Sequence, residues 1–160
     1  MGYTFGSKIV DYPIKNSSID IEYTKIDPWV YEHKDITTTY KHIGYNLGHW
    51  IGQNADQIKI QFNYYFLRSL KASFFAERIR KGGLKDIYYA YKTTEIQPFL
   101  YSPVRKDYLY GLNVTYNPLH DVFLKGKFQY SDISDEDITR TPSFLLGKHF
   151  SFNVSLSYGM

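Results

Sequence analysis

Cysteine is absent from this chain of 160 residues, and so is any long apolar run. Without cysteine, the chain has no disulfide, no thiolate nucleophile and no cysteine-ligated zinc site. A membrane-spanning helix needs about 20 consecutive apolar residues. No stretch of the chain approaches that length, so the sequence excludes helical crossing of a membrane.

The chain also lacks a strong excess of charge of either sign. It has 19 basic and 16 acidic residues, for a net charge of +3. The basic residues are spread along the chain, whereas nucleic-acid-binding proteins gather them into a patch or stripe. We therefore expect no nucleic-acid partner.

Aromatic residues are what the chain has in excess. They make up 19% of it, with 17 Tyr and 11 Phe against 2 Trp. The mean hydropathy is nevertheless negative, at −0.41. Strands that face lipid on one side and water on the other combine many aromatics with a polar average in this way.

Apolar and polar residues alternate with period two over several segments, which is typical of half-buried strands. In the segment 57–66, every even-numbered residue is apolar or aromatic. The alternation predicts strands over 2–9, 19–24, 57–66, 70–77, 108–116, 122–130 and 150–158. Short connections at 67–69 and 117–121 separate some of these strands, and long ones at 27–54, 80–105 and 132–147 separate others.

Short turns on one rim and long loops on the other distinguish outer-membrane barrels from other meanders. The sequence therefore predicts an all-β fold, an antiparallel meander of six or seven strands that forms part of a transmembrane outer-membrane β-barrel. The most regular strand, 150–158, is aromatic-rich, as expected of a terminal strand that the barrel assembly machinery recognises, although no Phe ends the chain.

Six or seven strands are too few for a single-chain bacterial barrel, which has at least about eight. An open sheet would leave unpaired edges in lipid, and the first residues do not resemble a signal peptide. We therefore expect residues 1–160 to be a fragment, the C-terminal portion of one barrel domain. The alternative is that several chains build one barrel.

Motifs of catalysis are missing, with neither a Gly-Xaa-Ser-Xaa-Gly elbow nor a phosphate loop. His33, His42 and His49 are spaced by nine and seven residues, which matches no compact metal motif. Asp20 and Glu22 share one side of a predicted strand, where lumen-lining charge balanced by neighbouring lysines explains them as well as acid–base chemistry does. We expect a non-enzymatic protein with no cofactor and no bound metal.

Two sets of residues are candidates for function. Basic side chains on the predicted inward faces are Lys59, Lys71, Lys125 and Lys127. They either line an ordinary polar lumen or form a cationic wall that attracts anionic solutes or polysaccharide. The aromatics of the first long loop, Trp29 and Trp50 among them, either stack on sugar rings or anchor the barrel at the membrane interface.

Three stretches carry a family resemblance. Glu22–His33 (EYTKIDPWVYEH), Gly44–Asp56 (GYNLGHWIGQNAD) and Arg78–Gly82 (RIRKG) resemble segments of the Wzi-like capsule assembly proteins. The resemblance covers roughly residues 12 to 130, and GHWIGQNAD is its most specific part. It implies a barrel larger than this chain, located in the bacterial outer membrane, which attaches or organises capsular polysaccharide in a lectin-like manner without enzymatic turnover.

The expected partners are thus outer-membrane lipid, capsular or other surface polysaccharide and the barrel assembly machinery. The resemblance supplies no sugar-contact motif, so the candidate polysaccharide-binding residues rest on position and chemistry. They are Trp29, Tyr31, His33, His49 and Trp50. The alternative function is a porin or transport channel of the outer membrane, in which the lysine-bearing faces line the pore.

Overall fold

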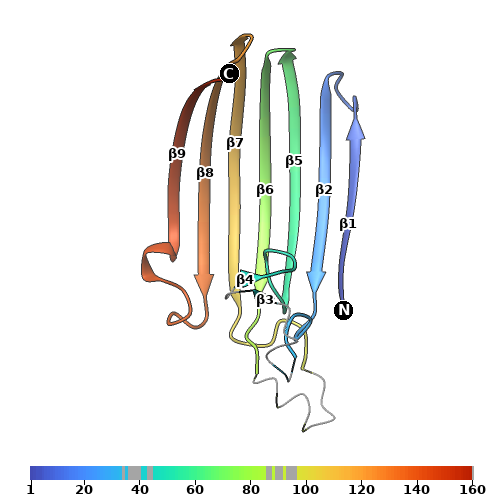
Figure 1. Cartoon of the computed structure of the whole chain (residues 1–160), viewed down its shortest axis with the longest axis vertical. Coiled ribbons are helices and arrows are strands. Elements are labelled where there is room, and N and C mark those ends of the chain that lie inside the picture. The colour runs from blue at the N-terminus through green and yellow to red at the C-terminus, as the bar shows by residue number, and fades with distance from the viewer. Residues whose placement is uncertain are drawn as a thin grey trace.

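The protein is a single antiparallel sheet with long connections at one end (Figure 1). The computed structural model describes residues 1–33, 35, 41–42, 45–85, 88, 92 and 97–159. The sheet runs in the order β1-β2-β5-β6-β7-β8-β9. Its strands are β1 (Gly2–Val10), β2 (Ser17–Ile26), β5 (Ala55–Leu67), β6 (Leu70–Lys81), β7 (Arg105–Leu119), β8 (Val122–Asp135) and β9 (Gly147–Tyr158).

Smaller elements lie in the connections. The two-residue strands β3 (Lys41–His42) and β4 (Tyr45–Asn46) pair with each other, and a 3-10 turn, η2 (Ser143–Leu145), precedes β9. Gly44, the first residue of the GYNLGHWIGQNAD stretch, lies outside the described residues. Within the described parts of the chain, no helix is long and apolar enough to cross a membrane.

The predicted all-β antiparallel meander is confirmed, including the strand at the N-terminus. Each strand extends beyond the alternating segment that predicted it, because backbone pairing continues into residues whose side chains do not alternate. The described strands do not close into a ring, since β1 and β9 each have a neighbour on one side alone.

The two kinds of connection lie at opposite ends of the sheet, as the sequence predicted. Figure 1 shows the turns β1–β2, β5–β6 and β7–β8 at the top, and the described parts of the β2–β5, β6–β7 and β8–β9 connections at the bottom. Asp11, Asn16 and Asp121 take positive φ in the short turns, a conformation that Asn and Asp tolerate better than most residues. The end of β9 lies with the short turns, and the start of β1 lies with the long connections.

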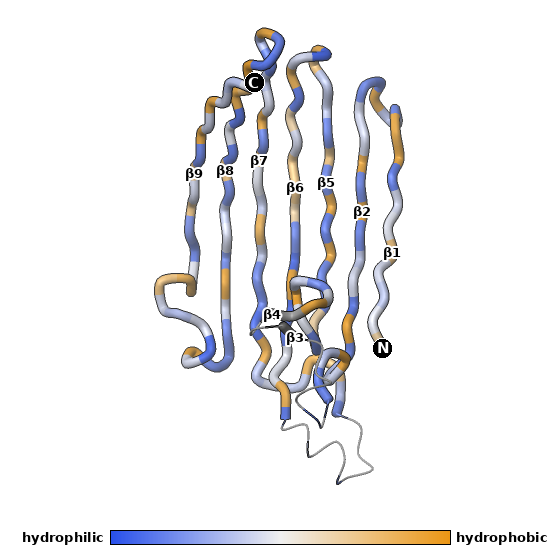
Figure 2. Tube along the Cα trace, viewed as in Figure 1, coloured by the Kyte–Doolittle hydropathy of each residue, from blue (hydrophilic) through white to orange (hydrophobic). Residues whose placement is uncertain are grey.

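The strand register separates the side chains onto two faces, and hydrophilic and hydrophobic residues alternate clearly along β5 (Figure 2). One row across the sheet is entirely apolar: Ile9, Ile19, Phe62, Phe74, Leu112, Phe128 and Phe152. The neighbouring row on the other side is polar from β2 to β9: Ser18, Asn63, Ser73, Asn113, Lys127 and Asn153. We call these sides the apolar face and the polar face. The apolar face is uncovered, with Phe74 54% and Phe152 75% exposed.

A small hydrophobic core lies on the polar face, near the long connections. Ile26, Ala55 and Ile79 from β2, β5 and β6 are buried there under Ile51 of the β2–β5 connection. Partly buried Tyr31 and Leu109 pack against the cluster. The β2–β5 connection therefore folds over the polar face.

Asn54 fixes that connection to the next one. It is fully buried, and its amide Nδ2 donates to the Gly83 carbonyl at 2.5 Å while Oδ1 accepts from the Leu100 N–H at 2.8 Å. Its backbone N–H donates to the Asp27 carbonyl, and its own carbonyl accepts from the N–H of Gly82. A Cβ on Gly82 would overlap the Asn54 amide and lie 2.8 Å from Leu100 Cα, so this close approach requires glycine.

We expect Asn54→Ala to lower the free energy of unfolding by about 2–4 kcal/mol, because each buried backbone group that loses its partner costs about 1–3 kcal/mol. The measurement is denaturant unfolding of the chain. Asn153→Ala, at an exposed position of β9, is the control and should change the stability by less than about 0.5 kcal/mol. Equal stability of the two variants would contradict the role given to Asn54.

Candidate functional site

The β2–β5 connection is held over the polar face by Tyr31 and its neighbours. The Tyr31 hydroxyl accepts the backbone N–H of His49 at 3.0 Å, and the Tyr31 N–H donates to Gln53 Oε1 at 3.0 Å. A Cβ on Gly48 would overlap the Tyr31 ring. The glycine thus lets the backbone pass close to the tyrosine and sets the path of the next two residues.

Trp50 follows at the point where the connection overhangs the sheet. Its side chain is 65% exposed, and the His49 ring stacks beside it with 6.1 Å between ring centroids. A hollow lies on either side of the indole. The smaller, of about 170 Å³, is lined by Ile51 and by Ile79, Lys81, Arg105 and Asp107 of β6 and β7.

The larger hollow, of about 320 Å³, is the candidate site, and we call it the Trp50 pocket. It is lined by Trp50, Lys59, Gln61, Phe75, Glu77, Leu109, Asn113, Lys127 and Gln129. All of these except Trp50 belong to the polar face of β5, β6, β7 and β8. Ligand pockets of about 300 Å³ or more commonly combine aromatic walls with a few polar groups.

Phe75 is an aromatic ring on the polar face. It pairs across the sheet with Gly111, and a Cβ on that glycine would overlap the Phe75 ring. The ring therefore lies flat over the glycine backbone, as aromatics do when they cover a strand glycine. This packing holds an aromatic surface in the floor of the Trp50 pocket.

The four lysines of the sequence analysis all lie on the polar face, but their surroundings differ. Lys59 lies between Glu22 and Glu77 in one cross-strand row, and Lys8 forms an ion pair with Asp20 at 3.2 Å. Lys8 therefore balances Asp20, whereas Lys59 is shared between the Glu22 and Glu77 carboxylates.

Lys127, in contrast, has only hydroxyls and amides as neighbours in its row. Its ammonium lies 5.9 Å from the centre of the Phe75 ring. Lys71 and Lys125 face each other across Thr115, nearer the short turns, and the Lys71 ammonium lies 5.4 Å from the Tyr65 ring centre. Uncompensated positive charge thus lies on the short-turn side of Lys59.

The predicted polysaccharide-binding residues are only partly brought together. Tyr31, His49 and Trp50 form one contact group over the polar face. Trp29 is half-buried, and its indole N–H donates to the Lys85 carbonyl at 3.2 Å, in the other long connection. His33 is exposed. Tyr31 is chiefly a support of the loop, which leaves Trp50 as the ring most open to a ligand.

Phe75, Asn113 and Gln129 are pocket residues that the sequence analysis did not single out. One signal was present, because Phe75 is an aromatic at a position that the alternation assigns to the polar face. Its partner Gly111 could be found only with the register of β6 against β7. Among the described residues, no group of His, Asp and Glu side chains is placed to hold a metal ion.

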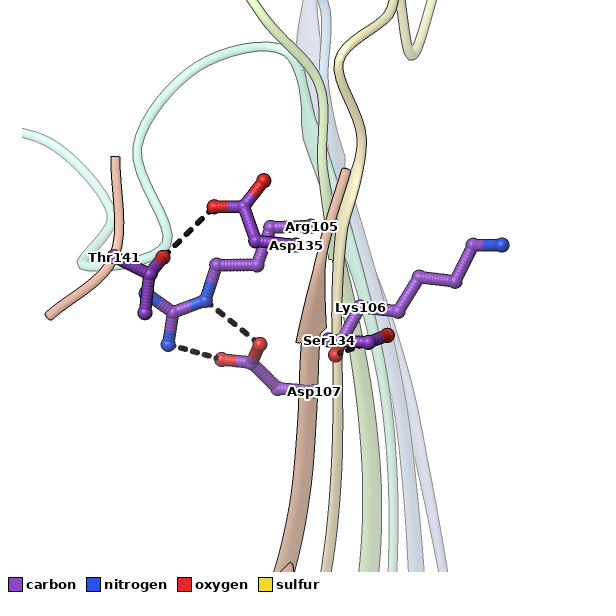
Figure 3. Close-up of polar contacts among 6 residues, drawn as sticks. All are labelled: Arg105, Lys106, Asp107, Ser134, Asp135 and Thr141. Carbon is purple, nitrogen blue, oxygen red and sulfur yellow. Dashed lines mark hydrogen bonds and ion pairs between the residues drawn. The ribbon is translucent and has the colours of Figure 1, made fainter. Parts of the chain in front are cut away.

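Beyond the pocket, Arg105 organises the rim at the long-connection end. Its guanidinium donates twice to the Asp107 carboxylate, both at 2.8 Å, and once to the Thr141 hydroxyl, which in turn donates to Asp135. Figure 3 shows this network on one side of the strands and Lys106 on the other. The network ties the β8–β9 connection to β7.

Comparison with known proteins gives no match: no family model, no curated protein and no solved structure is similar to this chain. The function has therefore to be argued from the faces of the sheet and from the Trp50 pocket.

Glu136 also joins two connections at the rim and should make their contact depend on pH. The Val104 N–H and the Ser102 hydroxyl donate to Glu136 Oε2 at 2.8 and 3.0 Å, and they hold the pKa of this carboxylate below its ordinary value of 4.5. A lowered pKa means that the contact is fully present above pH 4.5 and is lost as the pH falls through the folded-state pKa.

We expect the hydrogen-exchange protection of the Val104 amide to fall in acid and to be low at all pH values in Glu136→Ala, which has no side-chain acceptor. Asp121→Asn, at the short-turn end, should leave it unchanged. A Glu136→Ala variant with full protection at neutral pH would contradict this account.

Proposed function

We propose that this chain forms part of a transmembrane β-barrel of the bacterial outer membrane that holds capsular or other surface polysaccharide. The observation that carries the proposal is the separation of the two faces. One face is a continuous exposed apolar surface, and the other is polar and is overhung by Trp50. Lipid would cover the first face, and saccharide would bind on the second.

The dimensions of the apolar face support a place in lipid. On β7 its residues are Tyr108, Tyr110, Leu112, Val114 and Tyr116. Eight residue steps span about 27 Å along a strand, which at a barrel tilt of about 40° covers roughly 21 Å of the membrane normal, near the ~25 Å apolar band of outer-membrane barrels. Tyrosines at both ends match the aromatic girdles of such barrels.

The charges on this face support the same placement. At the long-connection end, charge begins in the Tyr108 row, which also holds Arg78, Asp132 and Lys148. The next row adds Lys25, Asp56, Arg80 and Lys106, and Arg80 pairs with Asp56, whose side chain is 1% exposed. Ions at the bilayer midplane are costly, whereas those near its surface are tolerated, so these two rows would mark the outer boundary of the lipid.

Lipid also requires partners for the sheet edges. A backbone N–H or C=O without a partner costs several kcal/mol in hydrocarbon, roughly as in other apolar media. The proposal therefore includes further strands that pair with β1 and β9. The larger barrel implied by the resemblance to the Wzi-like capsule assembly proteins would supply them.

The same resemblance suggests the role of the polar face. Its most specific stretch contains Gly48, His49, Trp50 and Asn54, which build the overhang and fix its base. An aromatic ring beside amides and charges would strengthen the binding of a polymer. The same ring would contribute nothing to conduction through a wide channel. The alternative of an anion-conducting porin is supported by Lys71, Lys125 and Lys127, but the overhang covers part of the same wall.

Placement in lipid is tested by two neighbouring arginine substitutions on β7. We expect Leu112→Arg, on the apolar face, to destabilise the protein in bilayers by about 2–4 kcal/mol, the cost of arginine near the midplane. Asn113→Arg, on the polar face, should cost less than about 1 kcal/mol. The measurement is unfolding from phospholipid vesicles. Equal costs would argue against lipid on the apolar face.

The role in polysaccharide attachment is tested in the host cell. We expect deletion of the gene to move surface polysaccharide from the cell-bound fraction into the medium while total synthesis stays the same. Complementation with the unaltered gene is the control. Unchanged cell-bound polysaccharide in the deletion strain would refute the proposed attachment role.

A further inference from the structure

We infer that the Trp50 pocket is a binding subsite for an acidic saccharide unit, a pyranose ring that carries a carboxylate. The inference rests on the proposed function, since it names the site and the ligand class through which polysaccharide would be held. Three properties of the pocket carry it: its aromatic surfaces, its amides and its one uncompensated charge.

Two aromatic rings face the pocket from different elements. Trp50 overhangs it from the β2–β5 connection with 65% of its surface exposed, and Phe75 lies in the floor on β6. The C–H faces of a pyranose are apolar and pack on aromatic rings. Both rings are positioned independently of any ligand, Phe75 by Gly111 and the Trp50 backbone by the Tyr31–His49 hydrogen bond. A preformed platform loses little conformational entropy on binding.

Side-chain amides line the hollow together with the rings. Gln61, Asn113 and Gln129 come from three strands, β5, β7 and β8, and Nε2 of Gln61 already donates to Asn63 Oδ1 at 2.8 Å. Each amide has both donors and acceptors, which suits sugar hydroxyls because these also donate and accept. A purely cationic or purely apolar ligand would leave these groups unsatisfied.

The charge of the pocket selects an acidic unit. Lys59 lies between Glu22 and Glu77 in one row, so both of its neighbours there are carboxylates, and the Gln57 amide donates to Glu77 at 2.5 Å. Lys127 has no carboxylate in its row. Its ammonium, close to the Phe75 ring, is therefore free to bind a carboxylate on a sugar stacked there.

A second hollow allows the polymer to continue. It has a volume of about 470 Å³, shares Lys59 and Gln61 with the Trp50 pocket, and runs toward Lys8 and Asp20 on β1 and β2. Lys8 and Asp20 already neutralise each other, and Glu22, which also lines this hollow, lies opposite Lys59. The continuation therefore fits a neutral or hydroxyl-rich neighbouring sugar, with the acidic unit at Lys127.

The test uses the full chain in detergent micelles, with trigalacturonate as the acidic probe and maltotriose as the neutral one. Trp29→Phe leaves Trp50 as the only indole, since the chain has two tryptophans. We expect saturable quenching of Trp50 emission by trigalacturonate, with at least about tenfold weaker binding of maltotriose, the factor that one lost charge-assisted hydrogen bond commonly gives.

Calorimetry on variants then assigns the residues. Trp50→Ala should weaken trigalacturonate binding by at least about tenfold and Trp50→Phe by less, because phenylalanine keeps a stacking face. Lys127→Gln should remove the preference for trigalacturonate over maltotriose. Its matched control is Lys125→Gln, which removes an exposed lysine from the same face of β8 outside the pocket and should bind as the unaltered chain does.

The outcomes separate this inference from the proposed function. Unchanged binding in both Trp50→Ala and Lys127→Gln, tighter binding of maltotriose, or no binding of either trisaccharide would overturn the pocket assignment. Each of these results is compatible with release of polysaccharide from the deletion strain, which alone decides the attachment role. An equal loss of binding in Lys125→Gln and Lys127→Gln would show general charge attraction and would also overturn it.

Discussion

The arrangement of the long-connection end depends on the burial of one amide, that of Asn54. Its two side-chain hydrogen bonds and two backbone ones join the start of β5 to Asp27, to the Gly82–Gly83 pair and to Leu100. A fully buried amide has to satisfy both of its ends, so neither connection can shift without breaking the other's contacts. Asn54 also takes positive φ, which Asn tolerates better than branched residues. The side chain and the backbone conformation thus favour the same residue.

The contacts of Asn54 also determine how the β2–β5 connection overhangs the polar face. Ile51 is buried three residues before Asn54 and brings the connection down onto Ile26 and Ile79. The exposed Trp50 side chain then lies above the polar face of β5 to β8. A flat polar sheet can contact a ligand only from below, whereas the overhanging connection can also contact it from above. The pocket is therefore a product of loop packing on the strands, and the side chains of the sheet alone would not form it.

Much of the fold was predictable, because apolar and polar residues alternate along a strand that has one apolar face. The segments 57–66 and 150–158 show this clearly, and both are strands of the structure. The lengths of the connections were enough to predict that the short turns lie at one end of the sheet and the long connections at the other. The pocket was not predictable, since it depends on register and on long-range packing. The role of Phe75 in the pocket follows from its position opposite Gly111, which the sequence alone does not give. Likewise, the sequence does not distinguish Trp29 from Trp50, whereas in the structure the Trp29 indole donates to the Lys85 carbonyl and Trp50 stays exposed.

The number of strands in the sheet restricts how it can be completed. With seven antiparallel strands, the first and the last run in the same direction, so β1 and β9 point the same way. Copies arranged by rotation about a barrel axis would therefore meet through a parallel β9–β1 junction. A closed ring that is antiparallel throughout needs strands beside β1 and β9 that run opposite to both of them. Strand direction, more than strand number, thus favours a completing segment that is not a copy of this one related by rotation.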